Sequence, residues 1–292
     1  MKAYFNGFWN GFIDKTDGMH IGFFITLLTD VYSEEIIVSD NLDDSDILIE
    51  SIFLTNEYIN YKKWKHTFLF TGESRYAYCM SEYLSSYTCI LGFNPTTDNY
   101  VEFPLYIIYF KLNPTMTFEP TKHIKNNNAS VVISNENSYE RIIFVEALEK
   151  RMNVLSGGKY KNNIGGPIMP ICGGYSENLI NFYKESKFAI TMENTKQEHY
   201  ITEKLINGFR AGIIPVYWGS PHISEHFNTK RFLILEDDSD ESIDKVIDRM
   251  VNMSDEEYFQ IVNEPIFNEG INIDTVYNNA VNNIKKLVIN NI

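Results

Sequence analysis

Short apolar runs alternate with segments of helical periodicity along most of this chain, and this alternation constrains the fold more than any other feature. We expect strands at residues 3–5, 35–38, 47–53, 66–70, 89–93, 129–133, 186–192, 213–218 and 232–235. Helical segments lie between many of them, for example at residues 20–32. Strands separated by helices build βα units with a mostly parallel sheet. The sequence therefore predicts an α/β protein, with residues 89–93 closing the first sheet.

The alternation is interrupted once, at residues 111–128, where Pro114 and Pro120 accompany a loss of periodicity. A chain of 292 residues is long enough for two domains. We expect Rossmann-like domains at residues 1–122 and 123–275, and a C-terminal helix at residues 276–292 that packs back on the first domain. Two such domains facing each other enclose a cleft, and ligands bind beyond the carboxyl ends of the strands.

The net charge and the cysteine content indicate which binding partners and which cellular compartment to expect. The 39 acidic and 25 basic residues give a net charge of −14, which disfavours binding to nucleic acid. Cys79, Cys89 and Cys172 are odd in number and form no CxxC pair, which indicates reduced thiols in an intracellular protein. The sequence shows neither a signal peptide nor an apolar run of about 18 residues. We therefore expect a cytoplasmic protein without stable membrane insertion.

The most informative segment is a strand, a polar loop, a helix and a strand between Phe188 and Pro221. Thr202 is placed to cap the helix, so Glu203 and Lys204 fall in its first turn. The backbone N–H groups and the dipole favour an anion at that end, and Lys204 adds a full positive charge. Glu203 offers two acceptor oxygens for sugar hydroxyls. The turn is suited to a sugar nucleotide, although by itself it also matches an ordinary capped helix with a solvated Glu–Lys pair.

The whole segment resembles the α1,3/1,4-fucosyltransferase family, inverting enzymes with the two-domain GT-B fold. The matching residues are Phe188-Ala189-Ile190-Thr191-Met192-Glu193-Asn194, Tyr200-Ile201-Thr202-Glu203-Lys204-Leu205 and Pro215-Val216-Tyr217-Trp218-Gly219-Ser220-Pro221. Met192 departs from the phenylalanine usual in the family. The resemblance implies that the C-terminal domain binds GDP-fucose and the N-terminal domain the acceptor. The implied donor contacts are Asn194, Tyr200, Glu203 and Lys204.

A second segment resembles the start of the family's donor domain. Ser134-Asn135-Glu136-Asn137 precedes a helix that carries Arg141, and the resemblance implies that Arg141 contacts the diphosphate. A guanidinium can bind phosphate oxygens in a bidentate manner. The alternative is a helix-surface arginine paired with Glu140 or Glu146. Gly157 and Gly158 follow in a loop with a family counterpart, and bare backbone there would approach the nucleotide.

The acceptor side resembles the family in patches. Inversion needs a base for the acceptor hydroxyl, and Glu73 stands after a strand in a segment like the family's F-x-T-G-E, whose glutamate is the expected base. Glu73 read without the resemblance is a solvated loop carboxylate. Glu102 occupies a position where an arginine is expected, on the acceptor side. Trp9 could stack on an acceptor sugar or pack into the domain.

Two further patterns imitate metal sites. Residues 44–46 and 237–240 resemble DxD motifs, and we interpret both as acidic turns because Lys204, Arg141 and the helix N-terminus suffice to neutralise GDP. His222 and His226 lie four residues apart without further ligands, which favours surface histidines. No metal or other cofactor is expected.

Together these features predict an enzyme of glycan biosynthesis or protein glycosylation. It would transfer fucose from GDP-fucose to a glycan acceptor, at O3 or O4 of N-acetylglucosamine or a related sugar, with Glu73 as base. Another nucleotide sugar in the same fold, or a non-catalytic sugar-nucleotide or glycan-binding protein, remains open. A dinucleotide oxidoreductase is disfavoured because no GxGxxG follows a predicted strand.

Overall fold

The computed structural model describes residues 1–15, 19–73, 84–93, 97–113, 116–120, 122–124, 126–134, 138–169 and 176–290. Backbone contacts divide the chain into two compact units. The first unit contains residues 1–112, 197–200 and 272–292, and the second contains residues 113–196 and 201–271. Cys79 and Cys172 lie outside the described residues, whereas Cys89 is a buried free thiol whose pKa is raised by burial.

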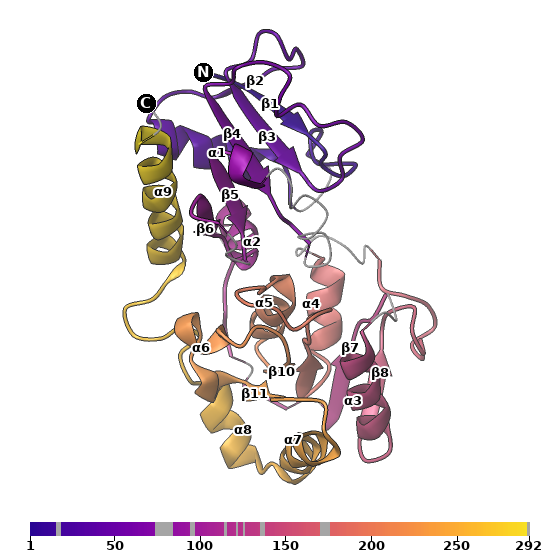
Figure 1. Cartoon of the computed structure of the whole chain (residues 1–292). Helices are drawn as coiled ribbons and strands as arrows, with labels where there is room; N and C mark the ends of the chain where they lie inside the picture. The colour runs from indigo at the N-terminus through magenta and orange to yellow at the C-terminus, as the bar shows by residue number, and fades with distance from the viewer. Residues whose placement is uncertain are drawn as a thin grey trace. The chain divides into compact units, whose positions relative to one another are not determined.

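The first unit is built on a parallel sheet with the strand order β2-β1-β3-β4-β5-β6 (Figure 1). The strands are β1 (Lys2–Asn6), β2 (Ile37–Val38), β3 (Ile47–Ser51), β4 (His66–Phe70), β5 (Cys89–Gly92) and β6 (Tyr100–Glu102). β3, β4 and β5 are buried along their whole length, as in a sheet covered on both faces, although Glu50 of β3 and His66 of β4 are polar. The expectation that residues 89–93 close the sheet is wrong, because β6 pairs beyond β5. Three residues are too few to show a strand pattern in the sequence.

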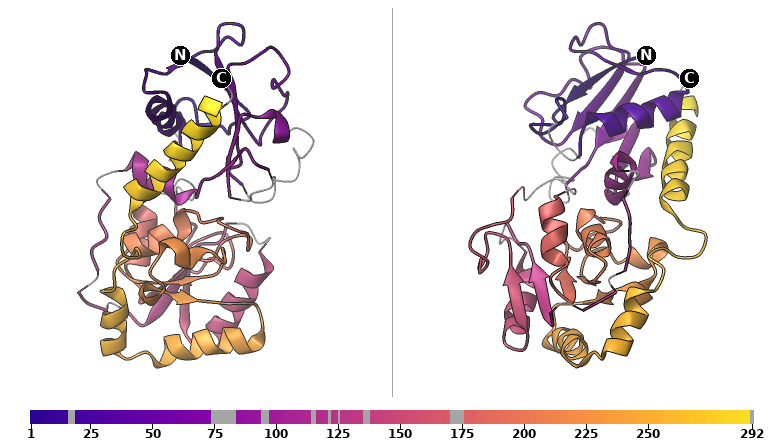
Figure 2. Two further views of the ribbon diagram at one scale, coloured as in Figure 1. Left: turned by 60° about the vertical axis from the view of Figure 1, so that its left-hand side comes forward. Right: turned by 180° about the vertical axis from the view of Figure 1, so that it is seen from behind.

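Among the described residues, this unit contains the helices α1 (Ile21–Tyr32), α2 (Tyr106–Leu112) and α9 (Ile273–Asn290). α9 packs against α1 and α2, and in both views of Figure 2 it lies, in yellow, alongside this unit. The Tyr277 hydroxyl donates to Asp30 on α1 over 2.6 Å, and Lys111 of α2 pairs with Asp274 over 3.0 Å. Ile284, fully buried, lies on the same apolar face of α9 as Tyr277. The last helix is therefore an integral part of the first unit.

The second unit has its own parallel sheet with the order β11-β10-β9-β7-β8. Its strands are β7 (Asn128–Val131), β8 (Asn153–Ser156), β9 (Phe188–Ile190), β10 (Ile214–Tyr217) and β11 (Leu233–Ile234). Its helices are α3 (Tyr139–Glu149), α4 (Glu177–Tyr183), α5 (Glu203–Arg210), α6 (Ile223–His226), α7 (Asp240–Asn252) and α8 (Asp255–Val262). β8 and α4 border a glycine-rich stretch that weakened their sequence signal. Two parallel α/β sheets confirm the predicted fold class.

No helix among the described residues has the length and apolarity needed to cross a bilayer. The cytoplasmic location expected from the sequence stays a prediction.

Candidate functional site

The N-terminus of α5 forms the centre of the candidate site in the second unit. Thr202 caps the helix, and its hydroxyl accepts a hydrogen bond from the backbone N–H of Lys204 at 3.4 Å. Glu203 and Lys204 follow in the first turn, and both side chains are partly exposed. The predicted strand, loop, capped helix and strand are thus present as β9, the loop, α5 and β10. This turn offers backbone donors, a helix dipole and an ammonium group to one anion.

Glu193 lies beneath this turn, three residues beyond the end of β9 (Phe188–Ile190), and is fully buried. The backbone N–H of Thr202 donates to its Oε1 at 2.7 Å, and Lys204 Nζ donates to its Oε2 at 3.1 Å. Burial raises the pKa of the Glu193 carboxyl, while the charge of Lys204 opposes this shift. The Oε1 of Glu203 lies 3.9 Å from Lys204 Nζ. Lys204 therefore lies beside two carboxylates, one buried and one partly exposed.

Arg141 supplies the second cation, on the first turn of α3. Its side chain is only 5% exposed, and Nη1 donates a hydrogen bond to Asn194 Oδ1 at 3.0 Å. The alternative of a helix-surface arginine is therefore wrong, and Glu146 instead pairs with Lys161 at 3.1 Å. β7 and β9 are neighbours in the sheet, so α3 and the loop after β9 begin at the same edge. This topology brings Arg141 and Asn194 together although 53 residues separate them.

Tyr183, at the end of α4, was not singled out from the sequence. Burial raises the pKa of its hydroxyl, Lys204 and Arg141 act against that shift, and Glu203 adds to it. All three charged groups therefore act electrostatically on one phenol. The sequence around Tyr183 does not indicate that its hydroxyl lies near these charged groups. The register between α4 and α5 is set by tertiary packing.

The two glycines that follow β8 are closely packed. A Cβ on Gly158 would lie 2.2 Å from the carbonyl oxygen of Ile133, and one on Gly157 would lie 2.6 Å from Cδ1 of Ile168. Backbone of the β8 loop therefore approaches the end of β7 directly. The contact of Gly157 and Gly158 with a nucleotide stays a prediction. Of the segment that precedes α3, residues 135–137 lie outside the described residues.

Glu73 follows β4 at the carboxyl end of the first unit's sheet. The backbone N–H of Thr71 donates to Leu91 O at 2.9 Å, which fixes the chain two residues before Glu73. A Cβ on Gly72 would lie 2.8 Å from the Phe70 ring, so a larger residue there would have to displace this ring. The Glu73 side chain is half-buried. Its position after a central strand is where catalytic groups of such sheets occur.

Trp9 follows β1, the next strand but one from β4 in the same sheet. Its ring packs edge-on against Phe12 at 5.3 Å and Phe53 at 6.2 Å, and it is half-buried. Phe53, which follows β3, is 41% exposed. Trp9 thus combines packing with a solvent-accessible part, and its contact with an acceptor stays a prediction.

Glu102 and Tyr200 both have partners within the first unit. Glu102 Oε1 lies 3.1 Å from Nδ1 of His199, and the Tyr200 ring contacts Phe93 with centroids 4.8 Å apart. Tyr200 is 2% exposed. Tyr200 therefore belongs to the first unit, whereas the other residues predicted to bind the donor belong to the second.

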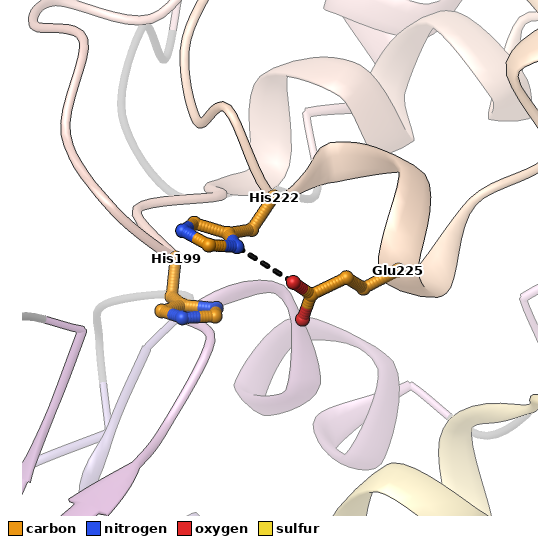
Figure 3. A group of neighbouring side chains, drawn as sticks. All are labelled: His199, His222 and Glu225. Carbon is orange, nitrogen blue, oxygen red and sulfur yellow. Dashed lines mark hydrogen bonds and ion pairs between the residues drawn. The ribbon is translucent and has the colours of Figure 1, made fainter.

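The patterns that imitate metal motifs have structural partners. Asp46 accepts a hydrogen bond from the backbone N–H of Lys2 at 2.9 Å, in the turn before β3. Asp237 accepts from the backbone N–H of Ser239 at 3.0 Å, and hydrogen bonds from Ser239 and Ser242 lower its pKa to about 2. His222 Nδ1 lies 2.6 Å from Glu225 Oε1 on α6 (Figure 3). The two aspartates agree with acidic turns. The expectation that His222 lacks a further potential ligand is wrong, because the Glu225 carboxylate lies beside it, and the expected absence of a metal stays a prediction.

The two parallel α/β sheets have the GT-B fold. Solved structures share this fold over 99% of the chain and 90% of theirs. An α1,3-fucosyltransferase superposes with a TM-score of 0.75 at 22% identity, and its structures with GDP and with GDP-fucose give 0.72 at 23% and 0.68 at 22%. Residues 122–261 match the model of "Glycosyltransferase family 10 (fucosyltransferase) C-term". Residues 122–261 are therefore similar to the C-terminal part of this fucosyltransferase family.

Named relatives align with part of the chain. The α-(1,3)-fucosyltransferase of Helicobacter pylori is 35% identical over 125 residues, which is 42% of this chain and 24% of the relative. A putative fucosyltransferase of Acanthamoeba polyphaga mimivirus is 37% identical over 114 residues, 39% of this chain and 19% of the relative. A GDP-fucose protein O-fucosyltransferase 3 of Gallus gallus is 43% identical over 58 residues, 19% and 12% of the two chains. The aligned segments span a quarter or less of these relatives.

Proposed function

We propose that this chain transfers L-fucose from GDP-β-L-fucose to a hydroxyl of a glycan acceptor, with inversion at the anomeric carbon. The observation that carries the proposal is Lys204 at the capped N-terminus of α5, where it is held 3.1 Å from the buried Glu193. The match of residues 122–261 to the fucosyltransferase model and the names of the relatives support GDP-fucose as the donor.

The second unit binds the donor in this proposal. Lys204, Arg141 and the N-terminus of α5 neutralise the charge that develops on GDP as the glycosidic bond breaks. Arg141 makes a bidentate contact with phosphate oxygens, and Asn194 orients the guanidinium through their hydrogen bond. Glu203 accepts hydrogen bonds from sugar hydroxyls. Two cations and a helix dipole balance the leaving group, so the reaction proceeds without a metal ion.

The first unit binds the acceptor, and Glu73 acts as the base. The acceptor oxygen attacks the anomeric carbon, its proton passes to Glu73, and GDP leaves with the electron pair of the broken bond. One displacement converts the β-linked donor into an α-fucoside. O3 or O4 of N-acetylglucosamine or a related sugar is the proposed nucleophile, and Trp9 provides an aromatic face for the acceptor ring.

The test is product formation from a matrix of donors and acceptors with EDTA present. GDP-fucose, GDP-mannose and UDP-galactose are each combined with N-acetylglucosamine- and galactose-containing acceptors, and products are read by mass spectrometry. Fucosylated product from GDP-fucose alone, with an α-linkage by NMR, supports the proposal. Product from another donor contradicts the donor assignment. Binding of GDP-fucose without product from any acceptor indicates a sugar-nucleotide-binding protein instead.

A further inference from the structure

Glu193 has no assigned role in the mechanism proposed above, although it is the fully buried carboxylate at the donor site. Three donor groups reach it. The backbone N–H and the hydroxyl of Thr202 donate to Oε1 at 2.7 and 2.9 Å, and Lys204 Nζ donates to Oε2 at 3.1 Å. Nζ also lies 3.0 Å from the Thr202 hydroxyl oxygen. The carboxylate, the hydroxyl and the ammonium group thus form a closed hydrogen-bonded triangle under the first turn of α5.

The surrounding backbone leaves room for this carboxylate and holds it in place. The N–H of Glu193 donates to Trp218 O at 2.8 Å, which continues the pairing of β9 with β10 beyond the strands. A Cβ on Gly219 would lie 2.7 Å from Glu193 Cγ, so the glycine there makes space for the side chain. A buried charge is costly unless it is paired and hydrogen-bonded. A carboxylate at this position is therefore maintained by its three donor groups.

Capping α5 does not by itself need a carboxylate. At the start of α4 the hydroxyl of Ser176 caps the helix by accepting from the backbone N–H of Leu179 at 3.2 Å. Thr202 caps α5 in the same manner. What Glu193 adds is a negative charge directly beneath the ammonium group of Lys204. A lysine side chain has four flexible bonds, and a fixed partner restricts its rotamers before any ligand arrives.

We propose that Glu193 is a positioning residue that holds Lys204 Nζ at the N-terminus of α5, aimed at the diphosphate of the donor; this inference rests on the proposed function. An ammonium group fixed before the reaction stabilises the leaving group without reorganisation. Because Glu193 partly neutralises Lys204 in the ground state, its benefit appears mainly as charge grows on GDP. The effect is therefore expected in kcat more than in the KM for GDP-fucose.

The test is a double-mutant cycle of Glu193→Gln, Lys204→Ala and the combined variant. The glutamine Oε1 can still accept from Thr202, so the cap is preserved while the charge under Lys204 is removed. We expect Glu193→Gln to lower kcat about tenfold and to change the KM for GDP-fucose less than about threefold. The combined variant should be no slower than Lys204→Ala, because Glu193 acts through Lys204. Effects that multiply would overturn the inference, since they assign Glu193 an independent role.

Glu177→Gln is the matched control. It removes a carboxylate on α4 that pairs at 2.9 Å with Arg210, and Arg210 lies at the C-terminal end of α5, opposite to Lys204. Its kcat should equal that of the wild type. Thermal unfolding verifies that each variant folds. If Glu193→Gln does not fold, Thr202→Val, which removes the bridging hydroxyl, takes its place in the cycle. The effects of Thr202→Val and Lys204→Ala on kcat should then be non-additive.

A second readout separates this inference from the proposed function. Acetylation of Lys204 by acetic anhydride, relative to the exposed Lys230, is followed by mass spectrometry without any donor. Release of Lys204 from Glu193 should raise its labelling rate several-fold in Glu193→Gln, and unchanged labelling would overturn the inference. If the wild type does not bind GDP-fucose, the proposed function is refuted. The positioning role towards the donor is then refuted as well, even if the labelling rates show that Glu193 holds Lys204.

Discussion

Arg141 Nη1 donates a hydrogen bond to Asn194 Oδ1 across 3.0 Å, which joins the first turn of α3 to the loop after β9. The two residues come from segments that follow neighbouring parallel strands, β7 and β9. An arginine buried to 5% exposure has lost most of its hydration, so its direction is set by such partners. The contact orients a guanidinium at the edge of the sheet where Lys204 also lies.

Replacement of Arg141 by lysine keeps the charge and removes the bidentate geometry. A hydrogen bond to a charged group contributes about 1.5–3 kcal/mol, so kcat/KM for GDP-fucose should fall about 10- to 100-fold. Arg151→Lys is the control, because Arg151 pairs with Asp248 on the surface. Steady-state kinetics with varied GDP-fucose measures both. An Arg141→Lys variant as active as Arg151→Lys would show that the bidentate contact is not used.

Glu73→Gln should remove the base while keeping the shape of the turn after β4. We expect kcat to fall about 10²- to 10⁴-fold, the usual contribution of general base catalysis, with GDP affinity unchanged. Glu57→Gln, an exposed carboxylate of the same unit, should retain full activity. GDP release and GDP titration together check this. A fully active Glu73→Gln would require another base.

Glu193 should make stability depend on pH in an unusual direction for a carboxylate. Burial raises its pKa in the folded state above the ordinary value of 4.5. Between these two pKa values the folded state binds more protons than the unfolded state, so the unfolding free energy rises as the pH falls. Glu193→Gln lacks this contribution. Urea unfolding followed from neutral pH down towards pH 4.5 should show the wild type gaining stability relative to the variant, and parallel curves would contradict the raised pKa.

The last helix should be essential to the first unit. Ile284→Ala removes a fully buried side chain of α9 and should cost about 2–5 kcal/mol of unfolding free energy, through lost burial and a cavity. Ile289→Ala, at a position 63% exposed on the same helix, should change it by about 0.5 kcal/mol or less. Urea unfolding compares the two. Equal effects would show that α9 does not pack through this face.

The sequence predicted those elements whose signal is local. The strand over residues 66–70 coincides with β4, and the cap at Thr202 starts α5 as expected, because apolar runs and capping residues act within a few positions. β6 was missed as the edge of its sheet because three residues carry too little pattern. β8 and α4 were missed because glycines flank them.

The charged residues of the candidate site could be predicted from the sequence, whereas the hydrogen bonds between them could not. Lys204 and Arg141 could be found from their motifs. That Glu193 would be buried under Lys204, and that Arg141 would contact Asn194, depends on how β7, β9 and β10 are ordered in the sheet. Strand order follows from tertiary packing over the whole unit. A carboxylate within three residues of the end of an apolar strand, as at Glu193, is nonetheless a usable signal for a buried anchor.

The most direct test of the account is titration of the chain with GDP-fucose by calorimetry, with EDTA present and no acceptor. Wild type, Lys204→Ala and the control Lys230→Ala, at an exposed lysine of the same unit, are compared. The account predicts binding by the wild type and by Lys230→Ala, and affinity at least about tenfold weaker in Lys204→Ala, since a charged contact to the diphosphate is lost. No binding by the wild type, or equal affinity in all three proteins, would contradict the placement of the donor at the N-terminus of α5.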